Sequence, residues 1–179
     1  MVLIETVGVG QSEHQVGSMV DFFLILLLPG GGDELQGIKK GILELADAIM
    51  INKADGESAS LARKTKLHYQ SAMSLLAGND FWKPEVHTCS ALEREGIEEC
   101  WLMMERFRQE AQDCDAYNHK RAEQNLQWMW QLTDEMLRQQ LTDHPGVGKM
   151  LPAVREQVGR GELTPVTAAT QIIAQLRGD

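Results

Sequence analysis

Ala48-Ile49-Met50-Ile51-Asn52-Lys53-Ala54-Asp55 is the stretch that decides the fold of this chain. Its first half is a short apolar run, and such a run followed at once by polar residues is typical of a buried strand. In an open α/β sheet, ligands bind at the carboxyl ends of the strands. We therefore expect Asn52, Lys53 and Asp55 to lie at the ligand-binding edge of a sheet.

The polar half of this stretch has the chemistry to select guanine. The carboxylate of Asp55 can accept two parallel hydrogen bonds from the ring N–H and the exocyclic amine of guanine, which adenine cannot offer. Asn52 would join the loop to the base, and the aliphatic stem of Lys53 would cover the face of the ring. The spacing therefore predicts a nucleotide-binding site that prefers guanine.

A second loop of interest follows the next predicted strand, Glu85 to Cys89. It reads Ser90-Ala91-Leu92, and its first two residues are small. Small residues after a strand allow backbone N–H groups to approach a ligand closely, so we expect this loop to meet the O6 atom of guanine. The prediction depends on the position of the segment, because the triplet alone is common.

The first residues predict another strand end. Met1 to Glu5 is an apolar run that closes in a carboxylate, and a glycine loop follows it. We expect a buried strand here, with Glu5 holding a Mg²⁺ ion through water and Gly8 letting a backbone N–H approach a terminal phosphate. The alternative is an ordinary strand-end glutamate followed by a turn.

Val20 to Leu28 is apolar almost without interruption, which is typical of a strand in a parallel sheet covered by helices on both faces. Gly30-Gly31-Gly32 then precedes a predicted helix from about Glu34 to Leu45, and this much glycine favours a mobile loop. Lys39 could reach a phosphate from there, although a solvated helix face is the alternative. The repeated strand–helix order predicts an α/β fold.

The pattern becomes entirely helical in the second half of the chain, and we place the domain boundary between residues 114 and 115. A long helix from Asn118 to Asp143 is predicted, then a break at Pro145-Gly146, a short helix at about 151–158, and a last helix capped by Thr164-Pro165. The long helix is apolar on more than one side. It packs either against a protein partner or between its own sheet and tail. Its large apolar residues are Leu126, Trp128, Met129, Trp130, Leu132, Met136, Leu137 and Leu141.

The composition excludes several classes of protein. The 179 residues carry 26 acidic and 17 basic side chains, a net charge of -9, which argues against a general nucleic-acid binder. The longest apolar run, Phe22 to Leu28, is too short to span a bilayer, and we expect no targeting to a membrane or for export. Cys89, Cys100 and Cys114 form no metal-binding pattern, so we expect reduced thiols in a cytoplasmic protein.

Four stretches occur together and in order, and they closely resemble the P-loop GTPases of the MeaB/ArgK type. These are the methylmalonyl-CoA mutase-associated GTPases, also known as LAO/AO transport system ATPases. The resemblance is strong over about residues 1–112 and looser over the helical tail. The stretches that carry it are Glu5 to Glu13 (ETVGVGQSE), Leu28 to Gly41 (LPGGGDELQGIKKG), Ile51 to Asp55 (INKAD) and Cys89 to Glu93 (CSALE).

The resemblance implies GTP and GDP binding with Mg²⁺, slow GTP hydrolysis, and homodimerisation through the C-terminal helices. It also implies a chaperone that delivers or protects the adenosylcobalamin cofactor of methylmalonyl-CoA mutase or a related acyl-CoA mutase. By position, the catalytic residues would be Glu5, Gly8 and Lys39, and the switch residues Gln11 and Asp33. The nucleotide-binding residues would be Asn52, Lys53, Asp55, Ser90, Ala91 and Leu92.

One departure from the family pattern is large, because no G-x-x-x-x-G-K-[ST] motif occurs in the chain. The nearest match ends in Gly148-Lys149-Met150, where Met150 replaces the Ser or Thr that would bind Mg²⁺. We therefore expect the C-terminal part of a GTPase, with a partial parallel sheet and a helical dimerisation region, to be inactive on its own. The alternatives are a non-enzymatic helical interaction module with vestigial nucleotide motifs, or a transport-linked kinase or ATPase, which the guanine-selecting motif disfavours.

Overall fold

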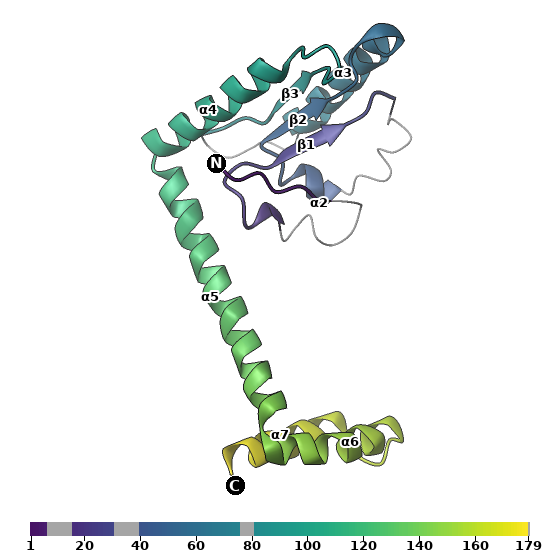
Figure 1. Ribbon diagram of the computed structural model, residues 1–179, viewed down its shortest axis with the longest axis vertical. Helices are drawn as coiled ribbons and strands as arrows, with labels where there is room; N and C mark the ends of the chain where they lie inside the picture. Colours follow the sequence, from purple (N-terminus) through teal and green to yellow (C-terminus); the bar gives the residue numbers. More distant parts are fainter. Residues whose placement is uncertain (7–15, 31–39, 76–80, 179) are drawn as a thin grey trace. The chain divides into compact units, whose positions relative to one another are not determined.

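A parallel three-stranded sheet forms the centre of the first part of the molecule. The computed structural model describes residues 1–6, 16–30, 40–75 and 81–178. Within them the strand order is β1 (Leu24–Leu27), β2 (Ala48–Ile51), β3 (Glu85–Thr88), and both pairings are parallel. Helices lie along the sheet (Figure 1). The predicted α/β fold with a parallel sheet is confirmed.

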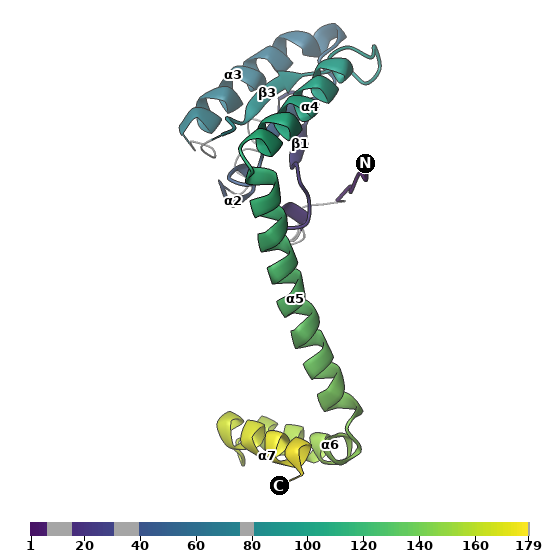
Figure 2. The same ribbon diagram turned by 90° about the vertical axis from the view of Figure 1, so that its left-hand side faces the viewer.

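The central strand β2 is buried on both faces. Ile49 and Ile51 pack in one cluster with α3 (Ala59–Leu75), whereas Ala48 and Met50 pack in another with α4 (Ile97–Asp113). None of the four residues is more than 1% exposed. Because successive side chains of a strand point to opposite faces, this alternation places the two helices on opposite sides of the sheet (Figures 1 and 2).

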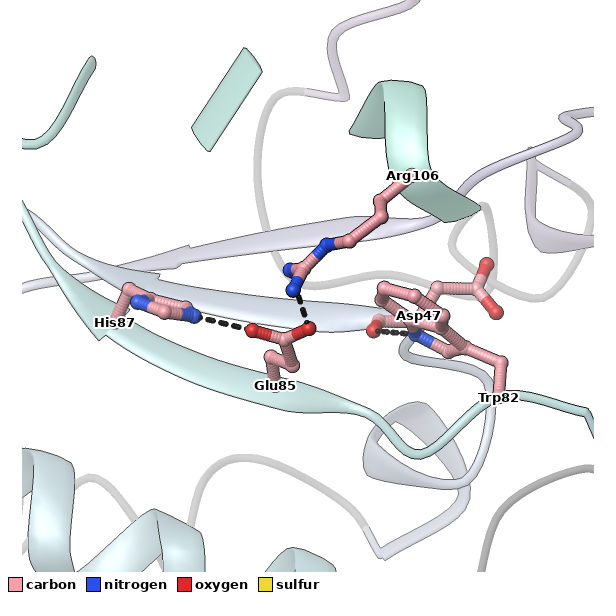
Figure 3. A network of polar contacts seen from close by, with 5 residues as sticks. All are labelled: Asp47, Trp82, Glu85, His87 and Arg106. Carbon is pink, nitrogen blue, oxygen red and sulfur yellow. Dashed lines mark hydrogen bonds and ion pairs between the residues drawn. The ribbon is translucent and has the colours of Figure 1, made fainter. Parts of the chain in front are cut away.

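A polar network ties α4 to the edge strand β3 (Figure 3). The carboxylate of Glu85 contacts His87 Nε2 through one oxygen and an Arg106 guanidinium nitrogen through the other, each at 2.7 Å. Arg106 also lies over the ring of Trp82, 5.8 Å from its centroid. Trp82 Nε1 in turn donates to the backbone oxygen of Asp47 at 2.9 Å, just before β2. The network thereby connects β3 and α4 to the start of the central strand.

Two strand predictions need correction. Met1 to Glu5 is not a strand, and its apolar side chains are exposed, from 50% at Ile4 to 85% at Val2. The sheet formed by the described residues consists of β1, β2 and β3, and this segment pairs with none of them. β1 is also shorter than the predicted Val20 to Leu28, and Leu26 is 65% exposed because β1 lies at the edge of this sheet.

The helix predicted from about Glu34 is described only at its end, as α2 (Lys40–Leu43), because residues 31–39 lie outside the described ranges. A single turn, η2 (Gly56–Ser58), leads into α3. Leu43 is buried in the same cluster as Ile49 and Ile51. The segment therefore contributes to the core on the α3 face of the sheet.

Contacts divide the chain into residues 1–124 and 125–179, inside the long helix α5 (Ala116–Asp143). The first turns of α5 are bonded to the segment before β1. Lys120 Nζ donates to the Asp21 oxygen and Gln124 Nε2 to the Val20 oxygen, both at 2.9 Å, and Arg121 pairs with the Asp21 carboxylate. The start of α5 is thus part of the first unit, although the helix begins close to the predicted junction at 114/115.

The second unit contains α6 (Pro145–Gly159) and α7 (Pro165–Arg177), which pack together. The long helix ends at Asp143, as predicted, but the next helix begins at Pro145 and not at about residue 151. Pro145 occupies the first helical turn, where proline is tolerated, and His144 caps it by accepting from Val147 N. Thr164 caps α7 as predicted. Within the described residues, no helix is both long and apolar enough to cross a membrane.

A glycine fixes the junction between β3 and α4. Gly96 precedes α4 with a φ of 74°, in the left-handed region that disfavours other residues. A Cβ atom there would lie 2.5 Å from the Thr88 oxygen and 3.1 Å from Cys89 Cβ. The chain can therefore turn from the loop after β3 into α4 only if this position has no side chain.

Gly96→Ala should lower the free energy of unfolding by at least about 2 kcal/mol, because left-handed strain and a backbone clash add. The matched control is Gly159→Ala, since a Cβ at Gly159 would meet no atom within 4 Å. Urea unfolding of both variants measures the difference. Equal stability of the two variants would show that the Gly96 junction relaxes freely.

Asp47 gives the fold a pH dependence. It is 6% exposed, and burial raises the pKa of its carboxyl, opposed by Lys120 and by the bond from Phe23 N. A raised folded-state pKa means that the folded chain binds this proton more tightly than the unfolded chain does. The resulting stability is present below the unfolded value of about 3.9 and is lost as the pH rises through the folded pKa.

Asp47→Asn removes this titration while keeping an oxygen that can accept from Phe23 N. The melting temperature of the variant minus that of the native chain should therefore increase as the pH rises above about 4, and should level off once Asp47 is ionised in the folded chain. Thermal melts at a series of pH values measure this difference. A difference that stays constant with pH would contradict the raised pKa.

Candidate functional site

The carboxyl ends of β2 and β3 bring the two predicted ligand-binding loops together. Cys89 N donates to the Ile51 oxygen at 2.8 Å, and Ala54 N donates to the Cys89 oxygen at 3.0 Å. These bonds extend the pairing of the two strands into the loops that follow them. The segments 52–55 and 90–92, which are distant in sequence, therefore form one surface at this edge of the sheet.

Asn52 joins the two loops through its side-chain oxygen. Its Oδ1 atom accepts from Lys53 N at 2.8 Å and from Ala91 N at 3.1 Å. Because the carbonyl side of the carboxamide is held by the protein, the Nδ2 donor is the atom available to a ligand. Asn52 is thus fixed in place before any ligand binds.

Asp55 is held by Ser90. The Ser90 hydroxyl donates to Asp55 Oδ1 at 2.6 Å, and the same hydroxyl oxygen accepts from Glu93 N at 3.0 Å. The bond from Glu93 N fills an acceptor position, so the hydroxyl hydrogen is directed at the carboxylate. Ser90 is only 1% exposed. The carboxylate therefore has one oxygen anchored by a buried hydroxyl.

The role of the Ser90 side chain is a feature that sequence reasoning missed. The sequence pointed to small residues at Ser90 and Ala91, whose backbone N–H groups would meet guanine O6. In the structure, Ser90 N instead donates to the Glu95 oxygen at 2.9 Å, and Ala91 N donates to Asn52. Both N–H groups hold the loop together. Serine hydroxyls commonly bond nearby backbone groups in turns, so a serine in this loop could have indicated a side-chain role.

Ser90 and Glu95 also close the loop after β3 into a small ring. Their backbones form an antiparallel bridge, in which Glu95 N donates back to the Ser90 oxygen at 3.1 Å. Lys53 is exposed with a left-handed φ of 60°, and Leu92 is 77% exposed. Hydrogen bonds therefore connect Asn52 with Ala91 and Asp55 with Ser90, whereas Lys53 and Leu92 present their side chains to solvent.

Of the five residues predicted to act on the phosphates or as switches, the structure describes only one. Glu5 lies in the exposed first segment, and the other four lie outside the described residues: Gly8, Gln11, Asp33 and Lys39. The described residues contain no cluster of three or more His, Cys, Asp or Glu side chains that could hold a metal ion. Glu5 alone does not make a magnesium site, so its role as a Mg²⁺ ligand stays a prediction.

The described donors and acceptors do fit a guanine base. Among the described residues, Asp55 Oδ2 receives no hydrogen bond, and the anchored Oδ1 keeps a further lone pair. The carboxylate can thus accept from two adjacent N–H groups, and Asn52 Nδ2 can donate to an acceptor on the opposite edge of a base. Guanine offers this combination. In adenine the corresponding ring nitrogen carries no hydrogen, so it would place an acceptor against the carboxylate.

Comparison with known proteins gives a consistent picture. Residues 1–146 match the family model described as methylmalonyl-CoA mutase-associated GTPase MeaB. A probable GTPase of Mycobacterium bovis is 43% identical over 174 residues, which are 97% of this chain and 52% of that protein. GTPase ArgK of Escherichia coli is 38% identical, with 96% and 52% covered.

Two further matches agree. The mitochondrial methylmalonic aciduria type A homolog of Mus musculus is 42% identical, with 97% of this chain and 42% of that protein covered. The crystal structure of a LAO/AO transport system kinase matches with a TM-score of 0.72 and 34% identity, over 96% of this chain and 55% of that chain. The chain spans about half the length of the curated relatives it matches. It belongs to the MeaB family of methylmalonyl-CoA mutase-associated GTPases.

Proposed function

We propose that this chain carries the guanine-recognising part of a GTP-binding and GTP-hydrolysing protein. The observation that carries the proposal is the pair of contacts between the two strand-end loops, Ser90 to Asp55 at 2.6 Å and Ala91 to Asn52 at 3.1 Å. They hold a carboxylate and a carboxamide in fixed positions on one surface. The family description and the names of the relatives, which include GTPase, support the same nucleotide.

The biological role we propose is that of a chaperone for methylmalonyl-CoA mutase or a related acyl-CoA mutase, assisting the loading or protection of its adenosylcobalamin. The words of the family description, which name the mutase, support this partner. The name of the mouse relative points to the same metabolism. Guanine recognition by Asn52 and Asp55 would make the assistance depend on the nucleotide.

For phosphate binding and hydrolysis we propose Glu5, Gly8 and Lys39, with Gln11 and Asp33 as switch residues and Mg²⁺ bound at Glu5 through water. A P-loop normally supplies the N–H cradle, the phosphate-binding lysine and the hydroxyl on Mg²⁺. The 179 residues contain no such motif. We therefore propose that this chain by itself binds guanine nucleosides weakly and does not turn over GTP.

The helical region from residue 115 onward is proposed to form a homodimer. None of the α5 residues is fully buried, and seven of its large apolar side chains are exposed by 42% to 64%. Exposing this much aromatic and aliphatic surface to water is unfavourable. A dimer in which a second copy of the chain covers this surface would therefore be stabilised. The exposed residues are Leu126, Trp128, Met129, Trp130, Leu132, Met136 and Leu137.

We propose the cytoplasm as the setting. Cys89, Cys100 and Cys114 are all free, which suits a reducing compartment. The excess of acidic over basic residues disfavours nucleic acid as a partner. The proposed partners are therefore a mutase, a second copy of the chain and a guanine nucleotide, with no nucleic acid and no membrane.

A second candidate function is a helical interaction module whose nucleotide motifs are vestigial. The exposed apolar surface of α5 favours it, because that surface needs a protein partner and no nucleotide. The two candidates differ in one respect that can be measured. Only the first requires the Asn52 and Asp55 side chains to discriminate between bases.

Asp55→Asn should switch the base preference of the chain from guanosine to xanthosine. The amide oxygen would take the place of Oδ1, because the Ser90 hydroxyl donates there, and the NH₂ group would face the ligand. That group repels the exocyclic amine of guanine but donates to the corresponding carbonyl of xanthine. We expect the native chain to prefer guanosine, and Asp55→Asn to prefer xanthosine, each by about tenfold or more. The reason is that each chain loses a hydrogen bond to the base that it does not match.

NMR titration of the chain with guanosine, xanthosine and adenosine measures these preferences in the millimolar range expected for a nucleoside. Glu57→Gln is the matched control, because it removes the same charge from an exposed neighbour of the motif and should leave the preference unchanged. If guanosine and adenosine shift the signals of residues 52–55 and 90–92 equally in the native chain, the interaction module is the better reading.

The proposed dimer should dissociate when Trp130 and Leu137, seven residues apart on one side of α5, are both changed to glutamate. Two buried charges without partners would cost far more than the surface contact contributes. Light scattering after size exclusion should give twice the chain mass for the native protein and the chain mass for the variant. Gln131→Glu, on a different side of the helix, should remain dimeric. A monomeric native chain at high concentration would refute the dimer.

A further inference from the structure

We propose that Cys89 is a positioning residue for base recognition: its thiol holds the Asn52 carboxamide so that Nδ2 faces the nucleotide. The inference rests on the proposed function and deepens it, because it adds a residue that touches no ligand but orients one that does. Cys89 lies at the end of β3, one residue before the loop that holds Asp55.

The backbone of Cys89 is fixed independently of its side chain. Its N–H donates to the Ile51 oxygen at 2.8 Å, and its oxygen accepts from Ala54 N at 3.0 Å. Residues 51 and 54 flank Asn52 on either side. Cys89 is therefore bonded to both ends of the segment that carries Asn52, and a side-chain substitution leaves these two bonds in place.

The thiol completes the set of donors around Asn52 Oδ1. The Cys89 Sγ atom lies 3.8 Å from Oδ1, which also accepts from Lys53 N and Ala91 N. The two N–H groups come from the loops, whereas the thiol approaches from the end of β3. A thiol is a weak donor, but a third contact from this direction restricts rotation of the carboxamide about its side-chain bonds.

The surroundings keep the thiol in the form that can donate. Cys89 is 5% exposed and packs in the cluster that includes Met50, Met103 and Phe107. Burial raises the pKa of the Cys89 thiol, and nearby Cys100 raises it further. The thiol is consequently protonated at neutral pH, so that a hydrogen is present between sulfur and the Asn52 oxygen.

The experiment compares Cys89→Thr with Cys89→Val in the 179-residue chain. Threonine and valine have nearly the same shape, and both are branched at Cβ and add a methyl group to the cluster. Only threonine has a hydroxyl that can donate to the Asn52 oxygen. Two quantities are measured: the NH₂ signals of Asn52 in the nitrogen-15 spectrum without ligand, and the affinity for guanosine in the same titration.

We expect Cys89→Thr to keep a single sharp pair of Asn52 NH₂ signals and an affinity within about twofold of the native chain. Cys89→Val should broaden or shift this pair and weaken guanosine binding by about threefold to tenfold, the effect of one weak hydrogen bond. Cys100→Val is the matched control, because it changes a partly buried thiol at the same cluster that donates nothing to Asn52. It should leave both measurements unchanged.

Similar Asn52 signals in the threonine and valine variants would overturn the inference, as would equal losses in both. The ligand-free spectrum separates this outcome from a failure of the proposed function. If the native chain does not bind guanosine, the proposed function fails, while the Asn52 signals still decide whether Cys89 orients the carboxamide. If the valine variant melts at a much lower temperature, the spectrum of Cys89→Thr against Cys89→Ala gives the same comparison.

Discussion

The hydrogen bonds that hold β2 between β1 and β3 determine the position of every group at the carboxyl edge of the sheet. β2 is only four residues long, yet it is paired on both sides and buried on both faces. The pairing continues past the strand ends, because Asn52 N donates to the Leu27 oxygen and Cys89 N to the Ile51 oxygen. Polar groups that follow such a strand start from a backbone with very little freedom.

The candidate site uses this rigidity to hold its side chains in advance. Ser90 orients the Asp55 carboxylate, and three donors converge on Asn52 Oδ1. Donors and acceptors that are already oriented lose little conformational entropy on binding, which favours discrimination between bases that differ by one amine. The loop from Ser90 to Glu95 is closed by the backbone bridge between these two residues. Gly96 then packs closely against Thr88 and Cys89, so the position of this loop is tied to the start of α4.

Prediction from the sequence failed for segments whose structure depends on what packs or pairs beside them. Met1 to Glu5 has the apolar pattern of a strand, but in the described residues no ladder reaches it and its side chains are exposed. Leu26 belongs to an apolar run, yet it is exposed because β1 is an edge strand. The chain does break after Asp143, but α6 starts at once with Pro145 at its first position, capped by His144, and not at about residue 151.

The sequence by itself determined the order of β1, β2 and β3, the buried character of β2 and the N-cap of α7. It also indicated that the segments 52–55 and 90–92 meet at one edge. These follow from local pattern and from the geometry of parallel strands. Only the tertiary structure decided which groups bond to which. Ser90 was recognised for its small size, but its hydroxyl orients Asp55, and the Ala91 N–H is used by Asn52. Hydrogen bonds between residues 35 or more positions apart depend on packing, because no local rule specifies how two loops meet.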